Sequence, residues 1–272
     1  MRFFNDFLGR EITIPTPPQR IVSLAPDMTE MVFRLGLGDA VVGISSFCHR
    51  PAEQLEGLPR LGSYLKIAWS RLEALKPDVV LTTLGAQRET AYRLLDAGYP
   101  VLALPVPLSI FGILENVRRL AAALGVAERG EHLNAQLAET LTRWRGALPP
   151  LRVYWEIDLG GPITAGPLTY VNDALHWLGL RNIYADLEAG YVAPDDTETR
   201  ARAPEIILYE PTRTRNPERA LERMKDRLGL AHVPVVLLPH DALAHYGPAL
   251  IDEVMPEVVA RVRAVLAQGA TA

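Results

Sequence analysis

Cysteine is almost absent from this chain of 272 residues, in which Cys48 is the single one. One thiol cannot form a disulfide within the chain, so no disulfide framework holds the fold together. No catalytic motif surrounds Cys48. We therefore expect a buried or site-lining thiol and not a reactive nucleophile.

Long apolar runs and a surplus of one charge are also missing. No stretch has 18 or more consecutive apolar residues, so no transmembrane helix is expected. The net charge of −4 provides no basic face for a nucleic-acid partner. Charged residues interrupt MRFFNDFLGREITIP at the start, where a secretory leader needs an apolar core. We expect a cytoplasmic protein, or a periplasmic one if a leader has been removed.

Catalytic signatures are missing as well. The sequence has no Gly-x-Ser-x-Gly, no phosphate-binding Gly-x-x-x-x-Gly-Lys and no His-Glu-x-x-His. The Gly-x-Gly of LGLGDA ends an expected helix instead of opening one after a strand, so it does not indicate a dinucleotide site. These absences favour a binding protein over an enzyme.

An internal repeat is the main positive feature of the sequence. Three pairs of segments match in the same order: residues 23–43 with 172–186, 72–83 with 199–211, and 97–105 with 230–239. The first pair shares an apolar helical pattern, Leu-Gly-Leu and a strand-like tail. The other two pairs each lead from a helix through a proline into an apolar run. Unequal spacing between the segments indicates a diverged duplication and not a solenoid.

Each half alternates helical patterns with short apolar runs such as VVLTT (79–83) and IILYE (206–210). Continuous runs rich in Val, Ile and Leu are typical of strands buried on both faces of a parallel sheet. Met28, Met31 and Val32 follow the spacing of a helix that buries one face. The sequence therefore predicts an α/β fold with two Rossmann-like lobes.

The longest helical patterns lie between the two halves, over residues 113–125 and 127–148. A helix of about 20 residues spans about 30 Å, which is enough to join two lobes, although an ordinary surface helix is the alternative. The expected domains are an N-terminal lobe (1–106), a linking helical segment (107–150) and a C-terminal lobe (151–272). Ligands of such sheets gather at the carboxyl ends of the strands, so a cleft between the lobes is expected.

Several motifs together resemble one protein family. RIVSLAP, LGLGDAVVG, FCHRP, LEALKPDVVL and AGYPVLAL follow one another in this order. On these motifs the chain resembles the substrate-binding proteins of ABC importers for cobalamin, haem and ferric siderophores, and FCHRP (47–51) is most similar to the cobalamin branch. The resemblance implies two α/β lobes joined by one long helix, a ligand in the cleft between them, and no catalysis.

The resemblance also implies a ligand and partners. The ligand is expected to be a corrinoid, with a ferric siderophore or haem as the alternative; no cofactor is required, and a monomer with a possible ABC permease partner is expected. Family members dock on the permease through a glutamate on each lobe. The first position corresponds to Ser70 here, with Glu73 one turn on, and the second falls near Asp195–Glu198. A chelate carrier or sensor without a leader is compatible with these differences from the docking glutamates of the family.

The candidate ligand-binding residues lie on or beside loops around the predicted strands. They are Pro26, Phe47, Cys48, His49, Arg50, Tyr64, Trp69, Trp155, Tyr191, His245 and Tyr246. Aromatic rings offer rigid apolar faces to a flat macrocycle, and Arg50 suits carboxylate, amide or phosphate groups. His49 is the candidate axial ligand of a bound metal.

Structural roles are the alternatives for these residues. Asp27 or Thr29, after Pro26, is expected to cap a helix, Trp69 to pack beneath one, and His245 to be hydrogen-bonded locally. Two other functions are also compatible with the sequence. One is a metal-dependent enzyme using His49, His240 and His245 with Asp241, and the other is a protein-interaction surface. An enzyme site of the first kind needs three ligands about 2 Å from one ion.

Overall fold

The computed structural model describes residues 1–63, 66–212, 214 and 216–269, and the chain divides into two compact units. Unit 1 comprises Met1–Val106 and Ile113–Ala138; unit 2 comprises Pro107–Gly112 and Glu139–Ala272. The segment 107–150, expected to be a separate link, is thus divided between the two units.

Unit 1 contains a four-stranded parallel sheet in the order β4-β3-β5-β6. Its strands are β3 (Ile21–Ser23), β4 (Val41–Ile44), β5 (Val79–Thr83) and β6 (Val101–Leu104). Every residue of β5 and β6 is buried, as their unbroken apolar runs predict. A hairpin of β1 (Arg2–Asn5) and β2 (Arg10–Thr13) forms a separate two-stranded sheet.

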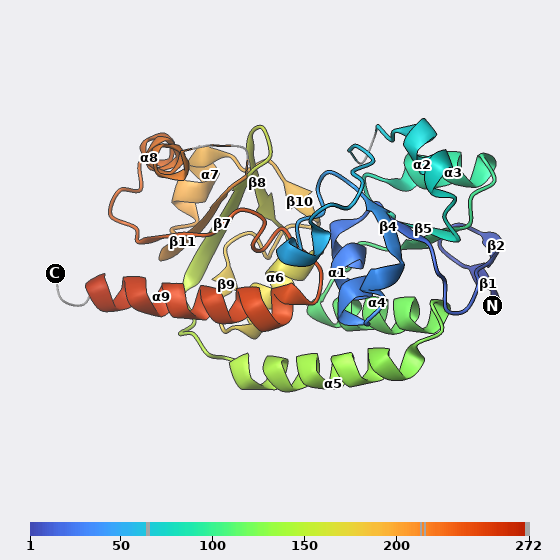
Figure 1. The fold of residues 1–272 in the computed structure, drawn as a ribbon. Helices are drawn as coiled ribbons and strands as arrows, with labels where there is room; N and C mark the ends of the chain where they lie inside the picture. Colours follow the sequence, from blue (N-terminus) through green and yellow to red (C-terminus); the bar gives the residue numbers. More distant parts are fainter. Residues whose placement is uncertain (64–65, 213, 215, 270–272) are drawn as a thin grey trace. The chain divides into compact units, whose positions relative to one another are not determined.

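Helices cover both faces of the unit 1 sheet. They are α1 (Pro26–Arg34), α2 (Trp69–Leu75) and α3 (Arg88–Asp96), with 3₁₀ turns η1 (Gly38–Ala40) and η2 (Ala52–Leu55). Helices α2 and α3 lie on one face, and α1 lies on the other (Figure 1). Helix α1 begins with Pro26 at its first position, where a missing N–H costs nothing. Its N-cap is Ala25, so the expectation that Asp27 or Thr29 caps it was wrong.

Two long helices connect the repeats: α4 (Ile110–Ala123) and α5 (Ala127–Trp144). Gly125, with φ +78°, makes the turn between them. Within unit 1, the Arg129 guanidinium of α5 donates hydrogen bonds to the carbonyls of Leu35 (3.0 Å) and Gly36 (3.1 Å) after α1. Within unit 2, the Trp177 indole donates to the Leu141 carbonyl of α5 at 2.7 Å. The helical prediction for this region is confirmed.

Unit 2 contains a six-stranded mixed sheet. Its strands are β7 (Arg152–Asp158), β8 (Pro162–Ala165), β9 (Arg181–Asn182), β10 (Tyr191–Val192), β11 (Ile206–Pro211) and β12 (Val235–Leu237). Strands β9, β7, β11 and β12 are parallel to one another. Strand β8 pairs antiparallel with β7, and β10 pairs antiparallel with β8. Residues successive along β7 face opposite sides, so Tyr154 and Trp155 lie on different faces.

The helices of unit 2 are α6 (Tyr170–Trp177), α7 (Asp196–Ala201), α8 (Pro217–Leu228) and α9 (Met255–Gly269), with a π-helical segment η3 (Leu250–Val254) before α9. Helices α7 and α8 lie on one side of the sheet and α9 on the other (Figure 1). Met224 of α8 packs against Tyr154 and Tyr209 in one core cluster. Among the described residues, no helix combines the length and apolar character needed to span a bilayer.

The two units repeat one topology, which confirms the predicted α/β fold. The parallel order β4-β3-β5-β6 of unit 1 corresponds to β9-β7-β11-β12 of unit 2. Helix α1 and its counterpart α6 are each followed by Leu-Gly-Leu, and both glycines have positive φ: +69° at Gly36 and +104° at Gly179. Only a glycine takes these turns without strain. The repeated Leu-Gly-Leu therefore marks the same turn from helix to strand.

Candidate functional site

A buried polar network joins the loops at the carboxyl ends of β3 and β4 in unit 1. The Thr29 hydroxyl donates to the Ser23 hydroxyl at 2.7 Å and lies 3.0 Å from the Cys48 sulfur. The Ser45 hydroxyl lies 3.2 Å from the same sulfur. Cys48 is fully buried, and its burial raises the pKa of the thiol. In this position Cys48 links the loop to helix α1 and has no surface to offer a ligand, contrary to its predicted role.

The loop after β4, residues 45–51, presents one large apolar side chain. Phe47 is 48% exposed, and its carbonyl oxygen lies 2.9 Å from His49 Nδ1. The Arg60 guanidinium donates hydrogen bonds to the carbonyls of Ser45 and Cys48, which fixes the loop from below. His49 itself is half-buried. The loop therefore offers the Phe47 ring on an anchored backbone.

Pro26 and Arg50, the other two candidates of unit 1 near these loops, are half-buried. Tyr64 lies outside the described residues.

Trp69 packs against other side chains of unit 1. Its ring centroid is 6.5 Å from that of Tyr99, which precedes β6, and the Arg93 guanidinium stacks 5.5 Å from the centre of the Trp69 ring. Trp69 also packs against the core cluster that includes Leu72 and Leu94. These contacts agree with the alternative interpretation of Trp69, in which its ring packs in the core and does not bind ligand.

Unit 2 brings four aromatic side chains together, which we call the aromatic group: Trp155, Tyr170, Tyr191 and Tyr246. The rings of Trp155 and Tyr191 are 6.4 Å apart between centroids, and those of Tyr170 and Tyr246 are 5.6 Å apart. Trp155 and Tyr170 are fully buried, Tyr246 is half-buried, and Tyr191 is 46% exposed. Burial raises the pKa of Tyr191 to about 12, so its hydroxyl stays protonated at neutral pH. Of the three predicted ligand-binding residues in this group, Trp155, Tyr191 and Tyr246, Tyr191 is the most exposed.

Glu210 binds the loop after β12, residues 238–249, and was not among the residues predicted from the sequence. Glu210, at the end of β11, is fully buried and accepts hydrogen bonds from the backbone N–H of Leu243 (3.0 Å) and of Ala244 (3.3 Å). The Trp155 indole donates to the same carboxylate at 3.3 Å. The Tyr170 hydroxyl donates to the Ala244 carbonyl at 2.7 Å. Both Trp155 and Tyr170 thus support the β12 loop.

His245 is buried and lies beside an acidic residue. Its Nδ1 is 3.5 Å from the Asp241 carboxylate, and only 2% of the residue is exposed. His245 therefore belongs to the packing of the β12 loop, as its alternative role predicts, while Tyr246 next to it keeps partial exposure. His240 is exposed.

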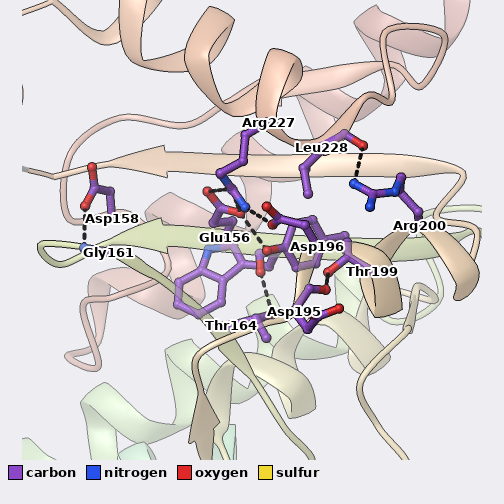
Figure 2. Close-up of polar contacts among 12 residues, drawn as sticks. Glu156, Asp158, Gly161, Thr164, Asp195, Asp196, Thr199, Arg200, Arg227 and Leu228 are labelled. Carbon is purple, nitrogen blue, oxygen red and sulfur yellow. Dashed lines mark hydrogen bonds and ion pairs between the residues drawn. The ribbon is translucent and has the colours of Figure 1, made fainter.

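The opposite face of the unit 2 sheet carries an ionic network (Figure 2). Arg227 of α8 donates to both carboxylate oxygens of Glu156, at 2.7 and 2.6 Å, and also pairs with Asp196 at the start of α7. The Tyr154 hydroxyl donates to Glu156 at 2.6 Å. Asp195 caps α7 by accepting the Glu198 N–H at 2.8 Å. This network ties β7, α8 and α7 together.

Exposed apolar side chains mark the ends of several strands. Phe47 follows β4, Leu159 follows β7 and is 50% exposed, and Leu168 follows β8 and is 55% exposed. Within unit 2, Leu159, Leu168 and Tyr191 each expose apolar surface, and the Tyr191 ring is a rigid face of the kind that suits a flat ligand. Within the described residues, no group of three or more His, Cys, Asp or Glu is arranged to hold a metal ion. The histidines proposed for a metal enzyme do not converge there.

Comparison with known proteins gives named relatives. An uncharacterised ABC transporter substrate-binding lipoprotein of Bacillus subtilis is 24% identical over 260 residues, covering 92% of this chain and 82% of that protein. A cobalamin-binding protein of Halobacterium salinarum is 28% identical over 199 residues, covering 71% of this chain and 53% of that protein. A vitamin B12-binding protein of Vibrio cholerae is 25% identical over 202 residues, covering 71% of each chain.

Two solved structures share the fold. The periplasmic haem-binding protein RhuT of Roseiflexus superposes with a TM-score of 0.76 at 26% identity, covering 91% of this chain and 98% of that one. The periplasmic vitamin B12-binding protein BtuF of Vibrio cholerae superposes with a TM-score of 0.73 at 22% identity, covering 93% and 99%.

A family match covers most of the chain. Residues 21–236 match the family described as periplasmic binding protein, whose members are substrate-binding components of transport. That description does not support the cytoplasmic location expected from the first residues. Because the match covers more than half of its residues, this chain belongs to the periplasmic binding protein family.

Proposed function

We propose that this chain binds a metal-centred chelate, specifically a corrinoid, without changing it chemically. The observation that carries the proposal is the set of apolar side chains exposed at strand ends, with Tyr191 backed by the buried Trp155 at 6.4 Å. The names of the cobalamin- and vitamin B12-binding relatives favour a corrinoid among the possible chelates.

Ring burial supplies the affinity in this proposal. An aromatic side chain buries about 150–250 Å² of surface. At about 25 cal/mol per Å², two such contacts contribute several kcal/mol before the cost of ordering the ligand. Tyr191 and Phe47 start out about half-exposed, so each has apolar surface left to cover. Because Trp155 and Tyr170 are buried, we assign them to holding the site in shape and not to contacting the ligand.

His49 is the proposed axial ligand of the bound metal. A neutral imidazole nitrogen coordinates cobalt or iron well. The contact between His49 Nδ1 and the Phe47 carbonyl orients the ring on the anchored β4 loop. We expect His49→Ala to change the visible spectrum of the bound chelate. An unchanged spectrum would make His49 a neighbour of the ligand only.

Haem is the second candidate ligand, and the structural likeness to the Roseiflexus haem-binding protein favours it. A difference-absorbance titration of the purified chain with hydroxocobalamin, haemin and a ferric hydroxamate, in parallel, separates the candidates. We expect the tightest saturable change with hydroxocobalamin. A clearly tighter response to haemin would move the assignment to haem, and no response to any of the three would remove the chelate proposal.

Delivery of the ligand to an ABC permease outside the cytoplasm completes the proposal. The relative named as a substrate-binding lipoprotein supports it. Glu73 is exposed on α2, whereas Asp196 and Glu198 on α7 are engaged by Arg227 and Arg202. We therefore expect Glu73, more than Asp196 or Glu198, to dock on the permease. Loss of permease-stimulated ATP hydrolysis in Glu73→Gln, with ligand affinity kept, is the expected result.

A further inference from the structure

Glu210 is a carboxylic acid in the interior of unit 2. It is fully buried at the end of β11, on the face of the sheet that also carries Trp155. An acidic side chain is rarely buried to this degree unless partners compensate for the loss of water. Among the described residues, its hydrogen-bond partners are N–H donors: the Leu243 and Ala244 backbones and the Trp155 indole. The carboxyl oxygens of Glu210 accept these three hydrogen bonds.

The donors come from two separate elements. Trp155 belongs to β7, while Leu243 and Ala244 belong to the β12 loop, 33 and 34 residues after Glu210. The carboxylate therefore connects the strand beneath the aromatic group to the backbone of the loop that carries Tyr246. Tyr170 adds a second support, because its hydroxyl donates to the Ala244 carbonyl. The loop backbone is thus fixed at Ala244 through both its N–H and its carbonyl.

Other titratable groups act on Glu210 from the surrounding elements. Asp241 of the β12 loop repels its negative charge, and burial together with this repulsion raises the pKa of Glu210 to about 8. His245 lies against Asp241 at 3.5 Å. Tyr170 of α6 and Tyr191 of β10 also interact electrostatically with Glu210, and both stay protonated because their own pKa values are raised. Burial and the Asp241 charge thus favour the protonated form of Glu210, whereas its N–H donors favour the ionised form.

We propose that Glu210 is a positioning residue, whose carboxyl group fixes the β12 loop against Trp155 and so sets the orientation in which Tyr246 and the neighbouring loop side chains meet a ligand. Ionisation places a negative charge in this buried position, which favours opening of the loop to water and so loosens it. The role in ligand binding rests on the proposed function. The coupling between the carboxylate and the loop does not, and it is measurable in the chain alone.

Nitrogen-15 NMR of the full chain tests the coupling without any ligand. The probes are the indole N–H of Trp155, one of four tryptophans and assignable by comparison with Trp155→Phe, and the amides of Leu243 and Ala244. We expect all three signals to titrate together with a midpoint near pH 8. Three flat profiles between pH 5 and 9, or three unrelated midpoints, would overturn the proposal.

Glu210→Gln provides the matching variant. Glutamine keeps the shape and, like the protonated acid, is uncharged and offers one carbonyl oxygen as an acceptor. We expect the shared titration to disappear, and the Leu243 and Ala244 amides to keep above pH 8 the hydrogen-exchange protection that falls by about tenfold in wild type. Glu156→Gln is the control, since Glu156 is also a buried glutamate but faces Arg227 on the other side of the sheet. The control should behave like wild type in both the titration and the hydrogen-exchange protection.

A ligand arm separates this inference from the proposed function. Cyanocobalamin affinity is measured for the wild-type chain and both variants from pH 6 to 9. We expect wild-type affinity to fall as pH rises through the same midpoint as the NMR signals, and Glu210→Gln to bind about tenfold more tightly than wild type at pH 9 with no midpoint. If wild type binds and Glu210→Gln matches it at every pH, the positioning role is wrong and the proposed function stands. If wild type does not bind cyanocobalamin, the proposed function fails for that ligand, while the NMR result still decides the coupling.

Discussion

Asp78 in unit 1 and Glu205 in unit 2 make equivalent hydrogen bonds to the backbone. Each follows a proline that precedes a strand, and each accepts hydrogen bonds from the backbone near the start of the neighbouring strand. Asp78 accepts from the Arg20 N–H at 2.9 Å, and Glu205 accepts from the Arg152 N–H at 2.8 Å. The duplication therefore extends to the side chains that anchor strand ends, in addition to the order of the elements.

Both units also have a residue with positive φ shortly before the anchoring carboxylate, which gives a first prediction. Lys76 and Ala203, two residues before Asp78 and Glu205, have φ of +44° and +48°. A residue with a Cβ is strained there by about 1–2 kcal/mol, whereas glycine is not, although glycine also gains freedom in the unfolded chain. We expect Lys76→Gly and Ala203→Gly each to raise the free energy of unfolding by about 0.5 kcal/mol in urea denaturation. Glycine at Ala201, inside α7, is the control and should lower it.

Trp69 gives a prediction that separates packing from binding. Its ring packs against Tyr99 and Arg93 and is half-buried, so we expect Trp69→Ala to lower the free energy of unfolding by about 2–3 kcal/mol. Ligand affinity should stay within about twofold, because the ring is engaged in packing against Tyr99 and Arg93. Trp69→Phe should recover most of the stability. A tenfold loss of affinity at unchanged stability would return Trp69 to the binding site.

The raised pKa of Glu210 predicts how stability depends on pH. The folded chain keeps the proton up to about pH 8, whereas an ordinary glutamate releases it near 4.5. The contribution of Glu210 to stability is therefore fully present below pH 4.5 and is lost as pH rises through 8, by up to about 1.4 kcal/mol per pH unit.

Denaturation of wild type and Glu210→Gln between pH 5 and 9 measures this slope. The wild-type chain should lose stability relative to the variant as pH rises. Glu218→Gln, at an exposed position on α8, should run parallel to wild type. Parallel curves for wild type and Glu210→Gln would show that Glu210 ionises normally.

Tyr191 gives the sharpest prediction for the site. Its exposed ring stacks near the buried Trp155, so a ligand that covers it gains apolar contact with a rigid surface. We expect Tyr191→Ala to weaken chelate binding by about tenfold, equivalent to about 1.4 kcal/mol, and Tyr191→Phe to bind nearly as well as wild type. Tyr92→Ala removes an exposed tyrosine from α3 and should leave affinity unchanged. Equal affinities for Tyr191→Ala and Tyr92→Ala would place the ligand elsewhere.

Much of the fold was predictable because the signals are local. The runs 79–83 and 206–210 became the buried strands β5 and β11, and Leu-Gly-Leu became the turn after both α1 and α6. The antiparallel edge strands β8 and β10 were not predicted, since β10 has only two residues and pairs across a distance in sequence.

The site was less predictable, because burial depends on contacts between distant segments. Cys48, Trp155 and His245 were expected to contact ligand and are buried in the structure. Glu210 was missed, although a charged residue ending the apolar run IILYE was a usable signal: an acid inside a buried strand demands a compensating partner. Phe47 and Tyr191 are exposed, but their predicted contact with ligand awaits a binding measurement.

Isothermal titration of cyanocobalamin into the wild-type chain tests the central claim most directly. The account predicts saturable binding of one ligand per chain with a Kd of about 1 μM or tighter, which corresponds to about 8 kcal/mol. The absence of any saturable heat at ligand concentrations of about 100 μM would contradict it.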